Sequence, residues 1–252
     1  MEKYLNKPER KLLFELLRLS LNGEMNEFSF EEQLTDTLWS KCYTLSCEQG
    51  VMALAFDGAM LLPSDLQPPK NIKIQWGMNV QNYIEKYNYY CNVAGELYAF
   101  YKKNGIAAVQ LKGVGLSLNY NNPSSRQGGD IDIYTYSATD ALTDKQANTK
   151  ADTLMQDMGV EVDTSGYKHS NFYYKNIPIE NHKCFLNIEH YSLAKKYNPI
   201  LLNCLNPKEQ TLNAQGAKIL TPSEQFNCLF ITFHAAQHLT SGIKLHHVYD
   251  WA

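Results

Sequence analysis

Apolar residues recur at helical spacing through the first hundred positions of the chain. The leucines of residues 8–22 repeat every three or four positions, with Pro8 at the start and Gly23 at the end, which is typical of one helix face and its two boundaries. The same spacing predicts further helices over residues 31–39, 46–62 and 72–103. We therefore predict a helical N-terminal region over residues 1–103.

Residues 104–195 carry a different pattern, made of short apolar or alternating segments. It predicts one helix, over residues 138–158, and strands over residues 106–111, 130–134, 159–162, 169–174, 177–181 and 184–191. Helical spacing returns in residues 196–252, where Thr221-Pro222-Ser223-Glu224 predicts a helix that starts with Thr221 as its N-cap and Pro222 as its first residue. Residues 245–252 resemble a helix that stops without a cap, as in a truncated chain. The fold class expected is α+β, with a small mixed sheet between two helical regions.

The segment Asp130-Ile131-Asp132-Ile133 places two carboxylates on one side of a predicted strand. Their Cα atoms would lie about 7 Å apart, and their like charges favour a cation between them. Mg²⁺ fits this position, because it prefers oxygen ligands and completes its coordination shell with water and phosphate oxygens. The pair is therefore a candidate metal site.

The residues before this pair fit the same chemistry. The apolar strand 106–111 runs into Lys112-Gly113, where a glycine lets the backbone approach a phosphate and a lysine adds positive charge. Arg126 precedes Asp130 by four positions, and its guanidinium group could clamp a phosphate or a carboxylate. We therefore predict that Lys112, Gly113 and Arg126 bind a nucleotide.

These motifs resemble the DNA polymerase β-like nucleotidyltransferase superfamily, and most closely its bacterial group of uncharacterised nucleotidyltransferases. The residues that carry the resemblance are Leu111-Lys112-Gly113, Tyr120, Arg126 and Asp130-Ile131-Asp132. The resemblance implies a nucleotidyltransferase core that uses Mg²⁺ or Mn²⁺ and an NTP such as ATP. It also implies a third carboxylate on a later strand, for which Glu189, followed by His190, is the candidate. Asp130, Asp132 and Glu189 would then be both the metal ligands and the catalytic residues.

The resemblance further implies transfer of a nucleoside monophosphate to a hydroxyl acceptor with release of pyrophosphate. The acceptor could be a small molecule, a protein side chain or an RNA end. His234 and His238 lie one helical turn apart, and the related group carries histidines there, so we expect both to face the nucleotide. Zinc on this pair, as in a metal hydrolase, is an alternative, although Ala235 stands where zinc proteases have Glu.

Composition narrows the remaining possibilities. A net charge of −3 argues against a protein that mainly grips nucleic acid backbone. No segment has the length of a membrane span or the pattern of a signal peptide, so we expect a cytoplasmic location. No pair of cysteines has zinc-site spacing; they are Cys42, Cys47, Cys91, Cys184, Cys204 and Cys228. A catalytically degenerate module that binds a nucleotide or a partner stays an alternative to the enzyme.

Overall fold

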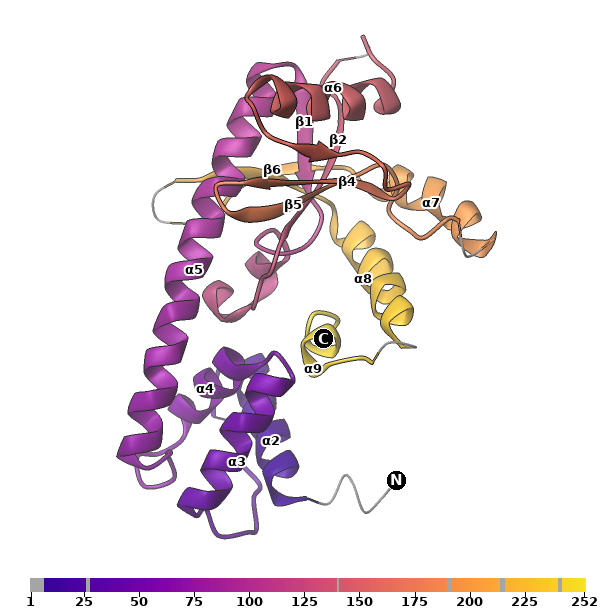
Figure 1. Cartoon of the computed structure of the whole chain (residues 1–252). Coiled ribbons are helices and arrows are strands. Elements are labelled where there is room, and N and C mark those ends of the chain that lie inside the picture. Colours follow the sequence, from indigo (N-terminus) through magenta and orange to yellow (C-terminus); the bar gives the residue numbers. More distant parts are fainter. Residues whose placement is uncertain (1–6, 26–27, 140, 190–191, 214–215, 240–241) are drawn as a thin grey trace.

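The computed structural model describes residues 7–25, 28–139, 141–189, 192–213, 216–239 and 242–252. Helices occupy a lower lobe, a mixed sheet with further helices forms an upper lobe, and one long helix joins the two (Figure 1). The helices are α2 (Pro8–Asn22), α3 (Asp36–Glu48), α4 (Met52–Leu61), α5 (Lys70–Lys103), α6 (Asp144–Asp157), α7 (Ser192–Cys204), α8 (Glu224–His238) and α9 (Leu245–Tyr249). The strands are β1 (Ile106–Gln110), β2 (Ile131–Ser137), β3 (Val162–Asp163), β4 (His169–Tyr174), β5 (Ile177–His182), β6 (Lys208–Thr211) and β7 (Lys218–Thr221).

The lower lobe packs α2, α3 and α4 against the first turns of α5. The leucines of α2 form its buried stripe, as their spacing predicts, and Gly23 ends the helix in the left-handed conformation with φ 74°. The predicted helices 31–39 and 46–62 are instead α3 and α4, because the chain turns at Gly50 with φ 69°. At the centre, the Trp76 indole N–H donates a hydrogen bond to the Met52 carbonyl oxygen at 2.9 Å.

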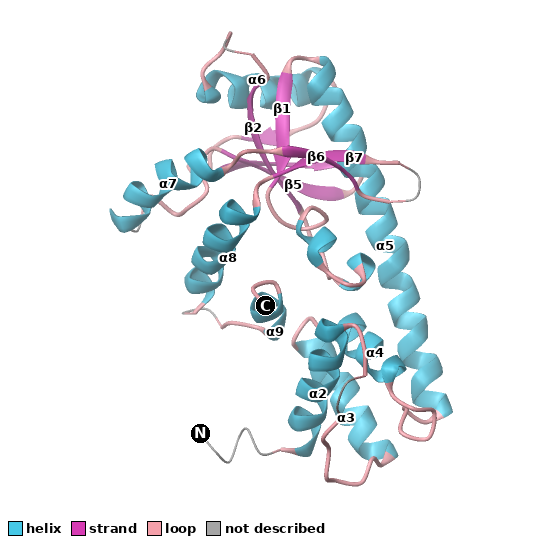
Figure 2. Cartoon of the chain, turned by 180° about the vertical axis from the view of Figure 1, so that it is seen from behind, coloured by secondary structure: helices cyan, strands magenta, loops and turns pink. Residues whose placement is uncertain are grey.

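Helix α5 belongs to both lobes. It has 34 residues, which gives a length of about 50 Å at 1.5 Å per residue. Ile72, Trp76 and Val80 are buried in the lower lobe, while Tyr90 to Tyr101 contribute to the core beneath the sheet. The helix therefore fixes the distance between the lobes (Figure 2).

The seven strands form one sheet in the order β3-β4-β5-β2-β1-β7-β6. Strand β2 is central: it pairs antiparallel with β1 and parallel with β5. Alternate residues of β2 enter different cores, because Ile131 and Ile133 pack with α5 and α6, while Tyr134 packs with residues of α7 and α8. The prediction of an α+β fold with a mixed sheet is confirmed.

Three local predictions are wrong. Residues 196–252 contain the hairpin β6–β7, which extends the sheet next to β1, so this region is not helical throughout. Residues 184–189 form a bend and a turn instead of a strand, and 190–191 lie outside the described residues. Helix α8 begins at Glu224 with Ser223 as its N-cap, because the Ser223 hydroxyl, two residues after Thr221, accepts the hydrogen bond from the Phe226 N–H.

Candidate active site

The turn after β1 lies directly beside the aspartates. Gly113 has φ 60°, and a Cβ atom there would come within 3.3 Å of the Asp130 carbonyl oxygen, so glycine suits both the conformation and the space. The Gln110 side-chain amide donates to the carbonyl oxygens of Lys112 (3.2 Å) and Asp132 (3.1 Å). Strand β1 thus fixes the turn against the start of β2.

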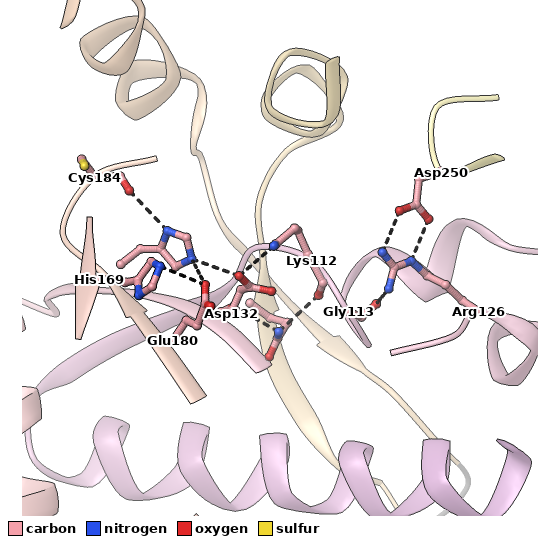
Figure 3. A network of polar contacts seen from close by, with 10 residues as sticks. Lys112, Gly113, Arg126, Asp132, His169, Glu180, Cys184 and Asp250 are labelled. Atoms are coloured by element: carbon pink, nitrogen blue, oxygen red, sulfur yellow. Dashed lines mark hydrogen bonds and ion pairs between the residues drawn. The ribbon is translucent and has the colours of Figure 1, made fainter. Parts of the chain in front are cut away.

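Asp132 is completely buried and lies at the centre of a polar network (Figure 3). Its Oδ1 atom lies 2.9 Å from Lys112 Nζ and 3.0 Å from His182 Nε2. Its Oδ2 atom is also buried, yet it has no hydrogen-bond partner among the described residues. A buried carboxylate oxygen without a partner is costly, and this atom is therefore a candidate ligand atom for a cation.

The neighbouring carboxylate comes from β5. The parallel register pairs Asp132 with Glu180 and Tyr134 with His182, which places Glu180 and His182 on the same sheet face as Asp132. Glu180 Oε2 lies 3.5 Å from the Nε2 atoms of both His182 and His169. One potential ligand atom from each of Asp132, Glu180 and His182 lies within 4.8 Å of the others. The structure thus groups Asp132 with Glu180.

Glu189 lies elsewhere. It is exposed, in a turn outside the sheet, and the described part of the strand from which we inferred its position, residues 184–189, forms a bend and a turn. The sequence did contain the signal for Glu180: in the predicted strand 177–181, Ile177 and Ile179 share the buried face, so Glu180 must face the other way. Sequence analysis missed it because it sought an acidic residue followed by His.

The charges of the site act on one another. Burial, and then the neighbouring Asp132, raise the pKa of Asp130. Burial would also raise the pKa of Asp132, but Lys112 and His182 outweigh it and hold that pKa far below its ordinary value. Burial alone would lower the pKa of Lys112, yet Asp132 and Asp130 raise it. Lys112 therefore interacts electrostatically with both Asp130 and Asp132, the two aspartates that we predicted to be near it.

Sequence analysis missed a second lysine. Burial, and then repulsion by Lys112, lower the pKa of Lys168, while Glu180 and Asp132 act on it in the opposite direction. Lys168 stands just before β4 and outside any motif, so only the folding of β4 beside β5 brings its charge to the site. The site therefore contains two lysines beside its carboxylates.

Arg126 is a clamp for a carboxylate of the chain itself. Its Nε and Nη2 atoms each donate to one oxygen of Asp250 at 2.8 Å, and Nη1 donates to the Gly113 carbonyl oxygen at 3.2 Å. This places Arg126 against the glycine turn, but its guanidinium fork holds Asp250 at the end of α9 instead of a phosphate (Figure 3). The direct contact with nucleotide that we predicted for Arg126 has no support in this arrangement.

His234 and His238 lie on α8, which runs from the sheet toward α9 (Figure 2). Burial lowers the pKa of His234 to about 2, with further lowering by Lys112 and an opposite effect of Asp132. Lys112 also contributes to the lowered pKa of His238, after burial. Charged groups of the acidic site therefore act on the pKa of both histidines. Their contact with a nucleotide stays a prediction.

The mixed sheet, the Lys112-Gly113 turn and the adjacent carboxylates define a nucleotidyltransferase-like α+β core. The chain belongs to the family of uncharacterised nucleotidyltransferases, which matches residues 35–252. This confirms the resemblance inferred from the motifs. No curated protein and no solved structure matches the chain. None of the described helices has both the length and the apolar character to cross a membrane.

Proposed function

We propose that the protein transfers a nucleoside monophosphate from an NTP to a hydroxyl acceptor and releases pyrophosphate, with a divalent metal bound at its acidic site. The observation that carries this proposal is the buried Oδ2 atom of Asp132, which has no partner among the described residues although Glu180 and Asp130 lie close by. Membership of a nucleotidyltransferase family supports the general class of reaction.

The residues present fit Mg²⁺ or Mn²⁺. Asp132, Glu180 and Asp130 supply carboxylate oxygens, which hard cations prefer. His182 instead supports Asp132, because its Nε2 faces a carboxylate and its Nδ1 lies 3.3 Å from the Cys184 carbonyl oxygen. Both partners are hydrogen-bond acceptors, and together they fix the orientation of the His182 ring beside Asp132. When bound, the metal would stabilise negative charge on the triphosphate and on the leaving pyrophosphate.

In this proposal the two lysines bind phosphate. Lys112 follows β1 and Lys168 precedes β4, so their charges reach the acidic site from two sides. Gly113 lets the backbone between β1 and the 3₁₀ helix Leu116–Asn119 approach the substrate closely. In this proposal Arg126 does not touch the nucleotide but holds the turn in place through the Gly113 carbonyl oxygen.

The reaction joins the acceptor oxygen to the α-phosphorus of the NTP and breaks the bond from that phosphorus to the bridging oxygen of pyrophosphate. Asp130 is the carboxylate best suited to accept the hydroxyl proton, because its pKa is raised, first by burial. The pKa of Glu180 is lowered, chiefly by its hydrogen bond with His182, which favours the ionised state of a ligand. Asp132 stays ionised through Lys112 and His182.

The test compares Asp132→Asn and Glu180→Gln with the matched control Glu189→Gln. Mn²⁺ binding by electron paramagnetic resonance and Mg²⁺-dependent NTP binding by calorimetry are measured, with each of the four nucleotides. We expect Asp132→Asn to abolish metal binding and Glu180→Gln to weaken it at least ~10-fold, while Glu189→Gln has no effect. Loss of metal binding in Glu189→Gln but not in Glu180→Gln would support Glu189 as the third carboxylate, as we inferred from the sequence. Unchanged binding in Asp132→Asn rejects the proposal, provided circular dichroism shows that each variant is folded.

A second assay separates the enzyme from a degenerate binding module. Pyrophosphate release is followed with Mg²⁺, each NTP, and pools of small hydroxyl compounds, RNA or protein as acceptor. Nucleotide binding without pyrophosphate release for any of these would favour the module. Pyrophosphate release that requires both Mg²⁺ and Asp132 would favour the enzyme.

A further inference from the structure

Three histidines from two helices converge near, but apart from, the acidic site. His234 and His238 lie one turn apart on α8, and His247 comes from α9. One ring nitrogen of each lies within 4.8 Å of the others. The ring centroid of His238 lies 4.7 Å from that of His234 and 4.6 Å from that of His247. We propose that these three imidazoles bind a divalent transition metal, with Zn²⁺ as the best-fitting ion.

The donor set selects the class of metal. Imidazole nitrogen suits Zn²⁺, Co²⁺ and Ni²⁺, whereas Mg²⁺ prefers oxygen. Zinc binds imidazole nitrogen at about 2.0–2.1 Å with tetrahedral geometry, so two ligand nitrogens end about 3.4 Å apart. Small side-chain rotations can close the spacing from its present upper limit of 4.8 Å. The set also matches three-ligand zinc sites, in which water or substrate takes the fourth position.

The contact of His247 shows how its ring is held, and the neutral imidazole ring is the form that binds a metal. His247 Nδ1 accepts a hydrogen bond from the Lys244 N–H at 3.1 Å, which orients the ring at the start of α9. Ligation by His247 would exchange this contact for the metal.

The position of the metal gives it a structural consequence. Asp250 follows His247 by three residues and is the carboxylate that Arg126 clamps. A metal that joins α8 to α9 would therefore fix the helix end that holds the glycine turn of the nucleotide site. This site differs from the acidic one in residues, donor atoms and preferred metal, and the proposal stands even if the protein transfers no nucleotide.

The test titrates the full chain with Zn²⁺ or Co²⁺ in excess Mg²⁺ and follows stoichiometry by calorimetry and cobalt absorption. Alanine at His234, His238 or His247 should each weaken binding at least ~100-fold, since even the loss of a supporting partner costs 10–100-fold. The matched control is His246→Gln, the neighbouring histidine whose Nδ1 lies 3.4 Å from the Gln49 carbonyl oxygen. It should keep the ion, and Zn²⁺ should raise the melting temperature of the control but not of the alanine variants.

Two further measurements identify competing sites. Asp132→Asn should retain the cobalt spectrum, and loss of that spectrum would move the ion to the acidic site and overturn the proposal. A thiolate-to-cobalt charge-transfer band would show that a cysteine binds the ion, which would also overturn the proposal. Unchanged affinity in all three alanine variants would also reject the site. If one alanine variant fails to fold, the cobalt spectrum of the wild type and the metal affinity of the alanine variants on the other helix still test the proposal.

Discussion

The contact between Arg126 and Asp250 makes a sharp prediction about stability. The two side chains are 10% and 9% exposed and meet through two hydrogen bonds of 2.8 Å. Asp250→Asn keeps the shape of the side chain but removes its charge, so that the buried guanidinium group loses the carboxylate with which it is directly paired. The turn is then still held by the hydrogen bond from Arg126 to the Gly113 carbonyl oxygen and by the Gln110 side-chain amide.

The burial of the pair sets the size of the effect. Breaking a buried pair by removing one partner costs about 3–5 kcal/mol, whereas an exposed pair contributes about 0.2–1 kcal/mol. A loss of 3 kcal/mol in a chain of this size corresponds to about 6–12 °C in melting temperature. Helix α9 has five residues and none of them is buried, so the variant can also respond by releasing α9, which would let Arg126 reach water and would limit the global loss.

Urea denaturation, thermal melting and amide hydrogen exchange measure the two responses. The matched control is Lys102→Met, which breaks a surface pair whose side chains are 62% and 35% exposed and should leave the stability nearly unchanged. We expect Asp250→Asn to lower the free energy of unfolding by at least about 3 kcal/mol, or to remove the amide protection of α9 and of residues 112–115. A variant that resembles the control in all three measurements would refute the reasoning that burial makes this pair stabilising.

Two further predictions concern the cores. Gly58→Ala should destabilise the lower lobe by about 1–3 kcal/mol, because its Cβ atom would lie 1.9 Å from a backbone oxygen of α2. The control Gly128→Ala, with open space around its Cβ atom, should melt like the wild type. Equal melting temperatures of the two variants would contradict the packing described for Gly58. Burial raises the pKa of Cys42 to about 12 and of Cys91 to about 11, so at pH 8 a thiol reagent should label exposed Cys228 first and reach these two only after unfolding. Ionisation of these thiols in the unfolded chain should make stability fall as pH rises above about 9, and rapid labelling of the native protein at Cys42 would show that its core opens.

Local patterns predicted much of the fold. The leucine spacing of α2, the long helix α5 and the hairpin β4–β5 follow from side-chain periods within single elements. Such patterns do not record which elements pair. The hairpin β6–β7 was missed for this reason, since its four-residue strands gain their stability from lying next to β1.

The sequence by itself determined that Asp132 lies near the start of one buried strand and that Lys112-Gly113 follows the end of another, because side-chain alternation is a local property of each strand. Only the tertiary structure decided the partners of these residues. The parallel register of β2 and β5 brought Glu180 to Asp132, and the docking of α9 brought Asp250 to Arg126. Residues that lie 48 and 124 positions apart in the numbering meet through packing and strand register, which no local period encodes.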